Sequence, residues 1–172
     1  MKKILILGTS SFGGAATANF LLNKKFFVIG TYRRKKSHLY QPHLQNSNVK
    51  NFKDFKIDFD LEKDISKIIK IISKYKPKYI IDFASICMVN ESWEQPETYI
   101  KSNLEKKSML IKKLCGNKFL EKYIYISTPE IFGSNKNSIK EDFNFFNPST
   151  PYAISKLAFE MILKSYGNQY NF

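Results

Sequence analysis

A tyrosine and a lysine near the end of the chain have a spacing suited to acid–base chemistry. Tyr152 and Lys156 follow Pro151 in the stretch NPSTPYAISK, and proline is common at the first position of a helix. Residues four apart share one helix face, so we expect the phenol and the ammonium to be neighbours. A phenol has a free pKa of about 10 and is a poor base, but a nearby ammonium favours the phenolate. The pair could then take a proton from a sugar or alcohol hydroxyl while hydride leaves the same carbon.

A second polar group stands directly after the apolar run KYIYI. Ser127, Thr128 and Glu130 follow one another there, with Pro129 between the last two. The group could be a polar strand exit in which Glu130 caps a turn. It could equally be the rim of an active site, where hydroxyls orient a substrate and a carboxylate moves protons. The residues alone leave both interpretations open.

The first apolar run is followed by a glycine-rich loop, GTSSFGG. A strand, a glycine loop and a helix in this order present backbone N–H groups and a helix dipole to a pyrophosphate. We expect Gly8 to permit the tight turn and Gly14 to let the helix pack close to the strand. Ser11 occupies the middle glycine position of the usual pattern, and its hydroxyl could add a phosphate contact. A purely structural glycine turn would look similar, but the position after the first strand favours a dinucleotide site.

Two adjacent arginines follow the second apolar run. An NAD site usually has an acid at the end of the second strand, whereas no acid occurs between residues 26 and 49. Arg33 and Arg34 are the only arginines of the chain, and guanidinium groups bind a 2′-phosphate well. This favours NADP, with NAD still possible. The alternative is a solvated basic turn.

The elements that would position these groups alternate along the chain. We expect strands at residues 3–7, 26–32, 52–58, 79–84 and 122–127, and helices at residues 14–23, 64–75, 96–115 and 152–166. The alternation predicts an α/β fold, a Rossmann-type doubly wound parallel sheet with helices on both faces. Ligands bind beyond the carboxyl ends of such strands, where each polar group above falls. We expect one NAD(P)-binding domain over residues 1–172, without the C-terminal substrate domain of a longer enzyme.

The composition excludes several classes of protein. Hydrophobic residues make up 43% of the 172, so disorder is not expected, and no apolar run approaches the roughly 18 residues of a membrane span. Two cysteines do not indicate a disulfide framework, and we expect a cytoplasmic protein. The net charge of +13 comes from scattered lysines, so we expect neither a specific nucleic-acid partner nor a membrane. His38 and His43 have no matching ligand cluster, and we assign no metal.

The motifs together resemble the extended short-chain dehydrogenases/reductases, in the nucleotide-sugar epimerase and 4,6-dehydratase group. The resemblance covers essentially the whole chain. The matching pieces are the glycine loop, Asp60-Leu61, DFAS (82–85), ESWEQPE (91–97), Asn103, STPEIFG (127–133) and FNPSTPYAISK (146–156). SWEQPE and the arginine pair are similar to GDP-mannose 4,6-dehydratases, and STPE and NPSTPYA to enzymes of the dTDP-glucose 4,6-dehydratase type.

This resemblance implies a three-part reaction on a nucleotide sugar. The sugar is oxidised at C4 by NADP, loses water across C5–C6, and regains hydride at C6. By the resemblance, Tyr152 deprotonates the C4 hydroxyl, Lys156 holds the phenolate and Thr128 bonds the C4 oxygen. Many dTDP-glucose enzymes have an Asp-Glu pair where this chain has Pro129 and Glu130. Glu130 would therefore remove the C5 proton and then serve as the acid as well.

The resemblance also implies binding residues and a partner. The cofactor residues would be Gly8, Ser11, Phe12, Gly14, Arg33, Arg34, Asp60, Leu61, Phe83, Ala84 and Ser85, with Tyr152 and Lys156. The substrate residues would be Cys87, Ser127, Thr128 and Glu130. Cys87-Met88 replace a common Ser-His pair, and Lys106-Lys107 replace a common Gly-Thr pair. A full-length protein would form a homodimer.

Two alternatives remain from the sequence. A nucleotide-sugar 4-epimerase or reductase of the same fold would not need Glu130. A non-catalytic Rossmann fragment that only binds cofactor is the other, because the sugar-nucleotide pocket of the group comes largely from the C-terminal half. That alternative depends on whether the reading frame continues past Phe172.

Overall fold

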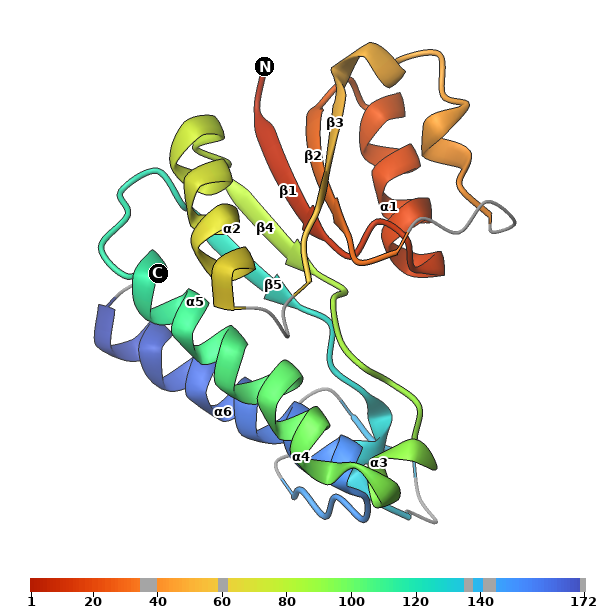
Figure 1. The fold of residues 1–172 in the computed structure, drawn as a ribbon, viewed down its shortest axis with the longest axis vertical. Helices are drawn as coiled ribbons and strands as arrows, with labels where there is room; N and C mark the ends of the chain where they lie inside the picture. Colours follow the sequence, from red (N-terminus) through yellow and green to blue (C-terminus); the bar gives the residue numbers. More distant parts are fainter. Residues whose placement is uncertain (35–39, 59–61, 135–137, 141–144, 171–172) are drawn as a thin grey trace.

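A layer of five parallel strands carries helices on both of its faces (Figure 1). The computed structural model describes residues 1–34, 40–58, 62–134, 138–140 and 145–170. The strands are β1 (Lys3–Leu7), β2 (Phe27–Tyr32), β3 (Phe52–Lys56), β4 (Tyr79–Asp82) and β5 (Lys122–Tyr125). The helices are α1 (Phe12–Asn23), α2 (Glu62–Tyr75), α3 (Glu91–Glu94), α4 (Pro96–Tyr99), α5 (Lys106–Leu114) and α6 (Pro151–Tyr170). Short turns are η1 (Pro42–Leu44), η2 (Val49–Asn51) and η4 (Pro129–Phe132), and η3 (Ile100–Glu105) is π-helical.

The strand order is β3-β2-β1-β4-β5, which confirms the doubly wound arrangement. The chain moves outward from β1 to β3, and then crosses to the other side of β1 to form β4. The order therefore reverses between β1 and β4, which is where ligands bind in open α/β sheets. The loops that follow these two strands must form that site.

Burial explains the strand positions. β1, KILIL, is the central strand, between β2 and β4. Both of its faces are covered by hydrophobic cores, so it reads as a continuous apolar run. The edge strands β3 and β5 carry exposed lysines, Lys53, Lys56 and Lys122. Charged side chains on edge strands oppose unwanted pairing.

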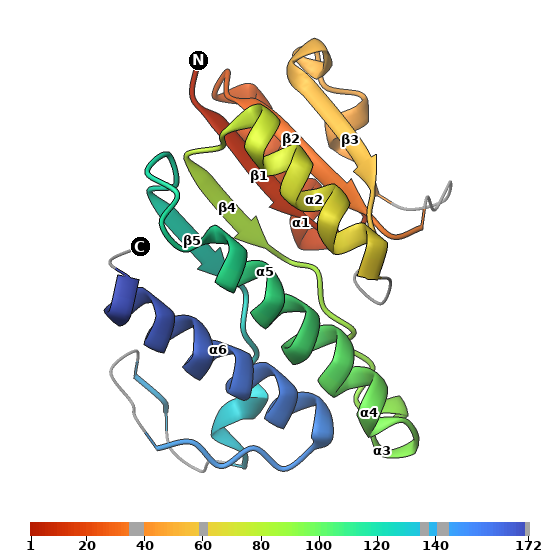
Figure 2. The same cartoon turned by 60° about the vertical axis from the view of Figure 1, so that its left-hand side comes forward.

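Each face of the sheet has its own core. Ile4 and Ile6 of β1 pack with Leu22 of α1 on one face. Leu5 and Leu7 face the opposite way, into a larger core formed with α2, α5 and α6. Figure 2 shows these three helices side by side over the sheet. The alternation along β1 follows from the two-residue side-chain period of a strand.

The region expected as one helix from Pro96 to Cys115 is more varied. α4, η3 and α5 follow without a break, and η3 has π-helical turns. Tyr99, Asn103, Lys107 and Ile111 are all at most 1% exposed, four residues apart. In a regular α-helix, residues four apart differ by about 40° around the helix axis, so these four side chains would not stay on one face. The wider π turns take up part of that difference.

Candidate active site

Two glycines shape the loop between β1 and α1. Gly8 has φ +88°, and a Cβ on it would lie 3.1 Å from the backbone nitrogen of Ala84 in the loop after β4. A Cβ on Gly14 would lie 2.2 Å from the carbonyl oxygen of Gly8. Gly8 thus brings the two loops of the switch point together, and Gly14 lets α1 begin against the turn, as predicted.

Ser11 caps α1 rather than leaving its hydroxyl open. The hydroxyl donates to the Gly8 carbonyl (2.8 Å) and accepts from the Gly14 N–H (3.1 Å). The first turn of α1 has no acid, so nothing there opposes an anion at the positive end of the helix. The phosphate contact of Ser11 stays a prediction. Phe12 is 75% exposed beside this turn, with its ring 5.4 Å from that of Tyr40.

A cavity of about 420 Å³ brings most of the predicted cofactor residues together. Of these, the cavity is lined by Gly8, Ser11, Phe12, Arg33, Arg34, Phe83, Ala84 and Ser85, with the predicted substrate residue Cys87 at one end. The lining also contains residues that the sequence analysis missed: Ser10, Thr31, Tyr32, Ile57, Asp58, Ile86 and Ser102. Gly14, Tyr152 and Lys156 do not line the cavity, and Asp60 and Leu61 fall outside the described residues.

The two arginines line this cavity and are exposed. Their side chains follow β2, where the 2′ substituent of a dinucleotide ribose would be recognised. Asp58, which follows β3, lines the same cavity. The absence of acids from residue 26 to 49 therefore does not exclude a carboxylate from the cavity, because β3 contributes one.

Tyr152 lies in the first turn of α6, with 8% of its surface exposed. Its ring meets that of Tyr99 edge-on, with the centroids 6.3 Å apart. Burial raises the pKa of Tyr152, and the negative charges of Cys87 and Glu130 act in the same direction, whereas a hydrogen bond with Thr128 opposes them. The expected lowering by Lys156 is not found in this arrangement, because the Lys156 ammonium is directed to other oxygens.

Lys156 is held by groups from two other elements. Its Nζ donates to the carbonyl of Ile126 (2.6 Å) and to the hydroxyl of Ser85 (3.0 Å). Burial lowers the pKa of Lys156 to about 7, and the positive charge of Lys107 adds to this. Asp82 is among the groups that oppose the change. The lysine predicted to sustain the phenolate is therefore near its own titration point at neutral pH.

Thr128 and Glu130 lie at the start of a short 3₁₀ turn. β5 ends at Tyr125, and Pro129 is the first residue of η4, a position that suits proline. The Thr128 hydroxyl accepts from the Glu130 N–H (3.4 Å), so Thr128 caps the turn. The Glu130 carboxylate accepts from the hydroxyl of Thr150, just before α6 (3.4 Å). The hydrogen bond with Thr150 places the Glu130 carboxylate near the start of α6, where Tyr152 lies.

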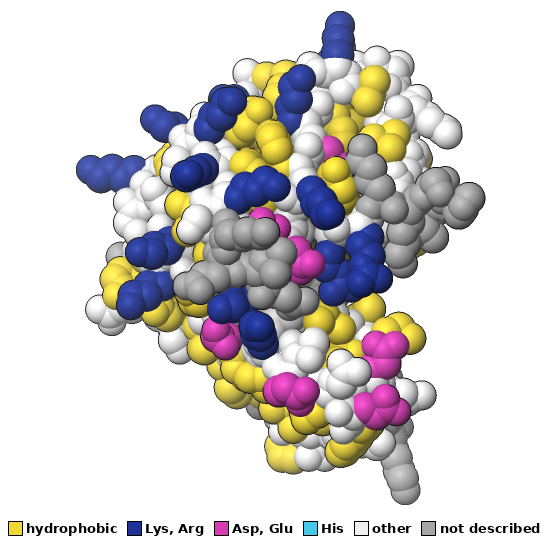
Figure 3. Space-filling model, viewed as in Figure 1, with side chains coloured by type: hydrophobic (Ala, Val, Ile, Leu, Met, Phe, Trp, Pro, Cys, Tyr) yellow, Lys and Arg dark blue, Asp and Glu magenta, His cyan; other side chains and the backbone are white. Residues whose placement is uncertain are grey.

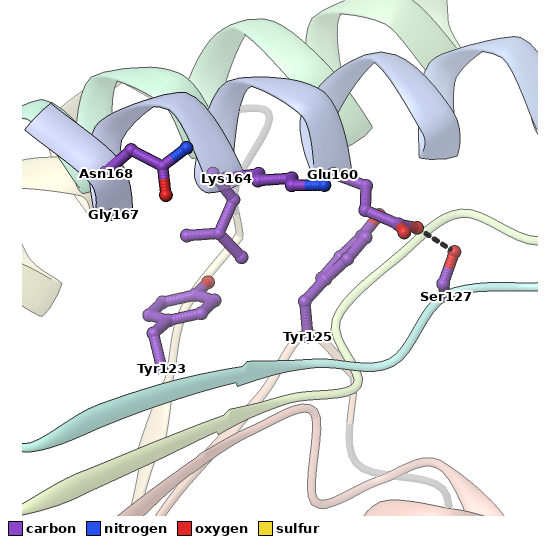
Figure 4. A pocket seen from close by; sticks show the side chains of 8 residues that line it. Tyr123, Tyr125, Ser127, Glu160, Lys164, Gly167 and Asn168 are labelled. Atoms are coloured by element: carbon purple, nitrogen blue, oxygen red, sulfur yellow. Dashed lines mark hydrogen bonds between the residues drawn. The ribbon is translucent and has the colours of Figure 1, made fainter. Parts of the chain in front are cut away.

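Ser127 lies apart from this group. Its hydroxyl donates to Glu160 of α6 (2.7 Å), in a hollow between β5 and α6 (Figure 4). Tyr123 and Tyr125 project into the same hollow from β5. The predicted substrate contact of Ser127 stays a prediction; while its hydroxyl donates to Glu160, it could only accept from a substrate.

The sequence analysis also missed a buried ion pair. Lys107 Nζ lies 2.7 Å from Asp82 Oδ2, and both side chains are 0% exposed. Asp82 Oδ2 also accepts from Tyr123, and Asp82 Oδ1 from the Ala84 N–H. The sequence did contain an indication that Lys107 is buried. It lies three residues before Leu110 and four before Ile111, which places it on the apolar face of α5.

Some site types are absent from the described part of the chain. No group of three or more His, Cys, Asp or Glu side chains in it could hold a metal ion, and His38 falls outside it. Among the same residues, no helix is long and apolar enough to cross a membrane. On the face in Figure 3, Lys and Arg side chains are spread widely rather than gathered in one patch.

Comparison with known proteins gives a consistent set of relatives. The family described as GDP-mannose 4,6 dehydratase matches residues 5–172. GDP-mannose 4,6-dehydratase of Vibrio cholerae is 28% identical over 179 residues, which are 98% of this chain and 46% of the relative. dTDP-D-glucose 4,6-dehydratase of Dictyostelium discoideum is 30% identical over 183 residues, 96% of this chain and 40% of the relative.

A solved structure gives the same architecture. UDP-glucose 4-epimerase of Bifidobacterium longum, in complex with NAD+ and UDP, superposes with a TM-score of 0.85 at 25% identity. The match covers 98% of this chain and 50% of the epimerase. The chain thus spans about half the length of the relatives it matches.

Proposed function

The chain belongs to the GDP-mannose 4,6 dehydratase family, and we propose that it carries the cofactor site and the proton-transfer residues of a nucleotide-sugar 4,6-dehydratase. The substrate we propose is a hexose joined to a nucleoside diphosphate, with GDP-mannose and dTDP-glucose as the two candidates. Relatives with both names match the chain at similar identity.

The chain's own residues fit a nicotinamide dinucleotide. Gly8 and Gly14 leave room that a Cβ would fill, and the N-terminus of α1 carries no acid. These features form a pyrophosphate cradle at the switch point of the sheet. When bound, the cofactor would accept hydride from C4 of the sugar and return it to C6.

Arg33 and Arg34 support NADP as the preferred form. Guanidinium groups pair with a 2′-phosphate and gain nothing comparable from a free ribose hydroxyl. We expect the double change Arg33→Ala and Arg34→Ala to weaken NADPH binding about tenfold or more, and NADH binding much less. Fluorescence titration of the two cofactors measures this. Tighter binding of NADH than NADPH by the unchanged protein would contradict the preference.

The proton transfers are assigned to three side chains. Tyr152 takes the proton of the C4 hydroxyl, and Thr128 donates a hydrogen bond to the C4 oxygen. The ketone at C4 acidifies the C5 proton, which Glu130 removes. Glu130 then gives that proton to the C6 hydroxyl, which leaves as water. When hydride returns to C6, C5 takes up one proton, which balances the proton that Tyr152 took from the C4 hydroxyl. Pro129 has no group to share this work, so one carboxylate serves as base and as acid.

One observation carries the proposal. The Glu130 carboxylate accepts a hydrogen bond from Thr150, two residues before Tyr152, and Thr128 and Glu130 both bear on the pKa of Tyr152. A base for the C4 hydroxyl and a carboxylate for the C5 proton therefore stand together at the end of β5. A 4-epimerase needs the first group and not the second.

The decisive assay uses protein expressed from the complete reading frame that contains this chain. The protein is incubated with NADP and with GDP-mannose or dTDP-glucose, and the sugar nucleotide is analysed by mass spectrometry and NMR. We expect one substrate to lose one water and form a 4-keto-6-deoxy sugar. The absence of this product from both substrates would contradict the proposal for both candidates.

Glu130→Gln tests the residue that distinguishes the reaction. We expect the dehydration rate to fall about 10²- to 10⁴-fold, with NADPH affinity unchanged. Glu121→Gln is the matched control, because Glu121 pairs with Lys78 on the surface and should retain full activity. Full dehydration activity in Glu130→Gln would overturn the role of Glu130 as base and acid.

A 4-epimerase is the second candidate, and the overall likeness to UDP-glucose 4-epimerase favours it. It predicts an inverted C4 hydroxyl without loss of water, which the same NMR analysis detects. The third candidate is a cofactor-binding unit without turnover, which the share of the relatives' length favours. It predicts NADPH binding and no product of either kind.

We also propose that the enzyme works as a homodimer through α5 and α6. Met109, Ile154 and Met161 are apolar side chains with exposures of 37%, 47% and 51% on these helices. Sedimentation of the protein alone should give twice the monomer mass, and Met161→Lys should reduce it to the monomer.

A further inference from the structure

A second buried lysine lies next to the proposed catalytic pair. Lys107 Nζ and Lys156 Nζ both lie within 3.3 Å of the same oxygen, Ser85 Oγ. Both also lie over the ring of Tyr125, at 4.9 and 4.2 Å from its centroid. Two ammonium groups therefore share one hydroxyl and one aromatic ring.

The two lysines are compensated unequally. Lys107 has a carboxylate partner, Asp82, at 2.7 Å and is 0% exposed. Lys156 is 3% exposed, and within the described part of the chain its hydrogen-bond partners are two neutral oxygens, those of Ile126 and Ser85. In a site of low dielectric, repulsion between like charges acts mainly on the charge that lacks a partner.

We propose that Lys107 is a positioning residue, which fixes Ser85 beneath Lys156 and disfavours the positive charge of Lys156. The inference rests on the proposed function only in taking Tyr152 and Lys156 as the reacting pair. The sequence resemblance gives Lys107 no role, because the group usually has a small uncharged residue at this position.

Every charged or titratable group around Lys156 belongs in this account. The groups come from α5 (Lys107), β4 and the loop after it (Asp82, Cys87), β5 (Tyr125) and α6 itself (Tyr152, Glu160). Burial is the largest cause that lowers the pKa of Lys156, and Lys107 is the second, whereas Asp82, Cys87 and Glu160 act against them. Among these side chains, Lys107 is thus the one whose charge lowers the pKa of Lys156.

The consequence is a limit on the working pH. In the proposed reaction Lys156 would support a phenolate at Tyr152 only while it is charged, and its ammonium would first have to turn from Ile126 and Ser85 toward the phenol. Lys107 moves the loss of that charge toward neutral pH. Without Lys107, the pair would retain its charge at higher pH.

The test is a titration of Lys156 by NMR in protein with ¹³C-labelled lysine, with the signal identified by its absence in Lys156→Arg. We expect a midpoint of about 7 in the unchanged protein and a midpoint about one pH unit or more higher in Lys107→Met. Asp82→Asn with Lys107→Met should give an intermediate midpoint, because both charges are removed. If Lys107→Met fails to fold, Lys107→Gln decides the question, because its amide can still donate to Asp82 without carrying a charge. The double variant loses two opposing effects and serves only as a comparison.

Lys106→Met is the matched control. Lys106 is the preceding residue on the same helix, but its ammonium pairs with Glu105 at 2.9 Å, so the midpoint of Lys156 should stay unchanged. Equal midpoints in the unchanged protein and in the foldable single Lys107 variants would overturn the inference and leave Lys107 a structural residue.

The titration needs neither substrate nor cofactor, so its outcome is independent of the proposed reaction. If the dehydratase assay succeeds, the alkaline limb of kcat should move upward in pH in the same variants, by the same amount as the midpoint. A shifted midpoint with an unshifted limb would overturn the link from Lys107 to turnover.

Discussion

The two ends of the active-site region are built differently. The cofactor end is a short continuous loop, Gly8 to Gly14, in which backbone geometry does most of the work. The catalytic end joins Asp82, Lys107 and Lys156 from three elements far apart in the sequence. A contiguous loop can be recognised by its spacing, whereas a dispersed cluster exists only once α5 and α6 have packed on the sheet. Stability at the cofactor end should therefore respond most to added side-chain atoms, and stability at the catalytic end to the removal of a charge.

The largest effect should come from breaking the buried ion pair. Lys107→Met leaves Asp82 charged and buried without its partner, so we expect a loss of about 3–5 kcal/mol in the free energy of unfolding. Asp82→Asn combined with Lys107→Met should recover most of that loss, because both charges are removed. Urea denaturation measures both variants. Equal stability of the single and double variants would show that the pair does not act as a unit.

A methyl group at the cofactor end should have the next largest effect. Gly14→Ala places a Cβ 2.2 Å from the Gly8 carbonyl oxygen, and we expect a loss of about 2–3 kcal/mol together with weaker NADPH binding. Gly13→Ala is the matched control. Its Cβ meets the edge of the Phe83 ring at 2.8 Å, and a side chain can move where a backbone oxygen cannot. Similar losses in the two variants would remove the special role of Gly14.

The dependence of stability on pH comes third. The pKa of Lys156 is about 7 in the folded chain, below the ordinary value of 10.5. Between these values the unfolded chain binds the extra proton, so the free energy of unfolding should rise with pH, by at most about 1.4 kcal/mol per pH unit from this group. Lys156→Met should reduce the slope between pH 7 and pH 9, measured by urea denaturation. Identical slopes would contradict the lowered pKa.

The smallest effect should be the loss of the helix cap. Ser11→Ala removes the acceptor for the Gly14 N–H, and we expect a cost of about 1 kcal/mol. Ser10→Ala, in the same loop, should change stability by less than about 0.5 kcal/mol. Thermal denaturation compares the two. A larger loss of stability in Ser10→Ala than in Ser11→Ala would contradict the assignment of Ser11 as the helix cap.

Most of the fold could be predicted from the sequence because its signals are local. Apolar strands such as KILIL and the helical period of α2 specify their elements directly. Strand ends were less accurate: β4 ends at Asp82 rather than at residue 84, because Phe83 and Ala84 turn to meet Gly8. The π-helical segment η3 has no local signature, since it satisfies contacts with other elements.

The site could be predicted in part for the same reason. The glycine loop, the arginines and Tyr152 are short motifs that can be recognised in the sequence. The glycine loop and the arginines line one cavity, and Tyr152 lies in the first turn of α6. The proton affinities could not be read from the sequence. The pKa of Tyr152 is raised because burial outweighs its polar contacts, and the pairing of Lys107 with Asp82 forms only where α5 packs on the sheet.

The π-helical turns of η3 have a consequence for insertions and deletions during evolution. Two α-helical turns take about seven residues, yet Tyr99 and Lys107 are eight steps apart and both buried. The segment thus contains one residue more than a regular α-helix would need to bring Tyr99 and Lys107 to the same face. Losing one residue there would relax the π turns into an ordinary helix and keep both ends facing the sheet. The same loss between Lys107 and Leu114 would turn buried side chains toward water, so drift in length should accumulate at η3.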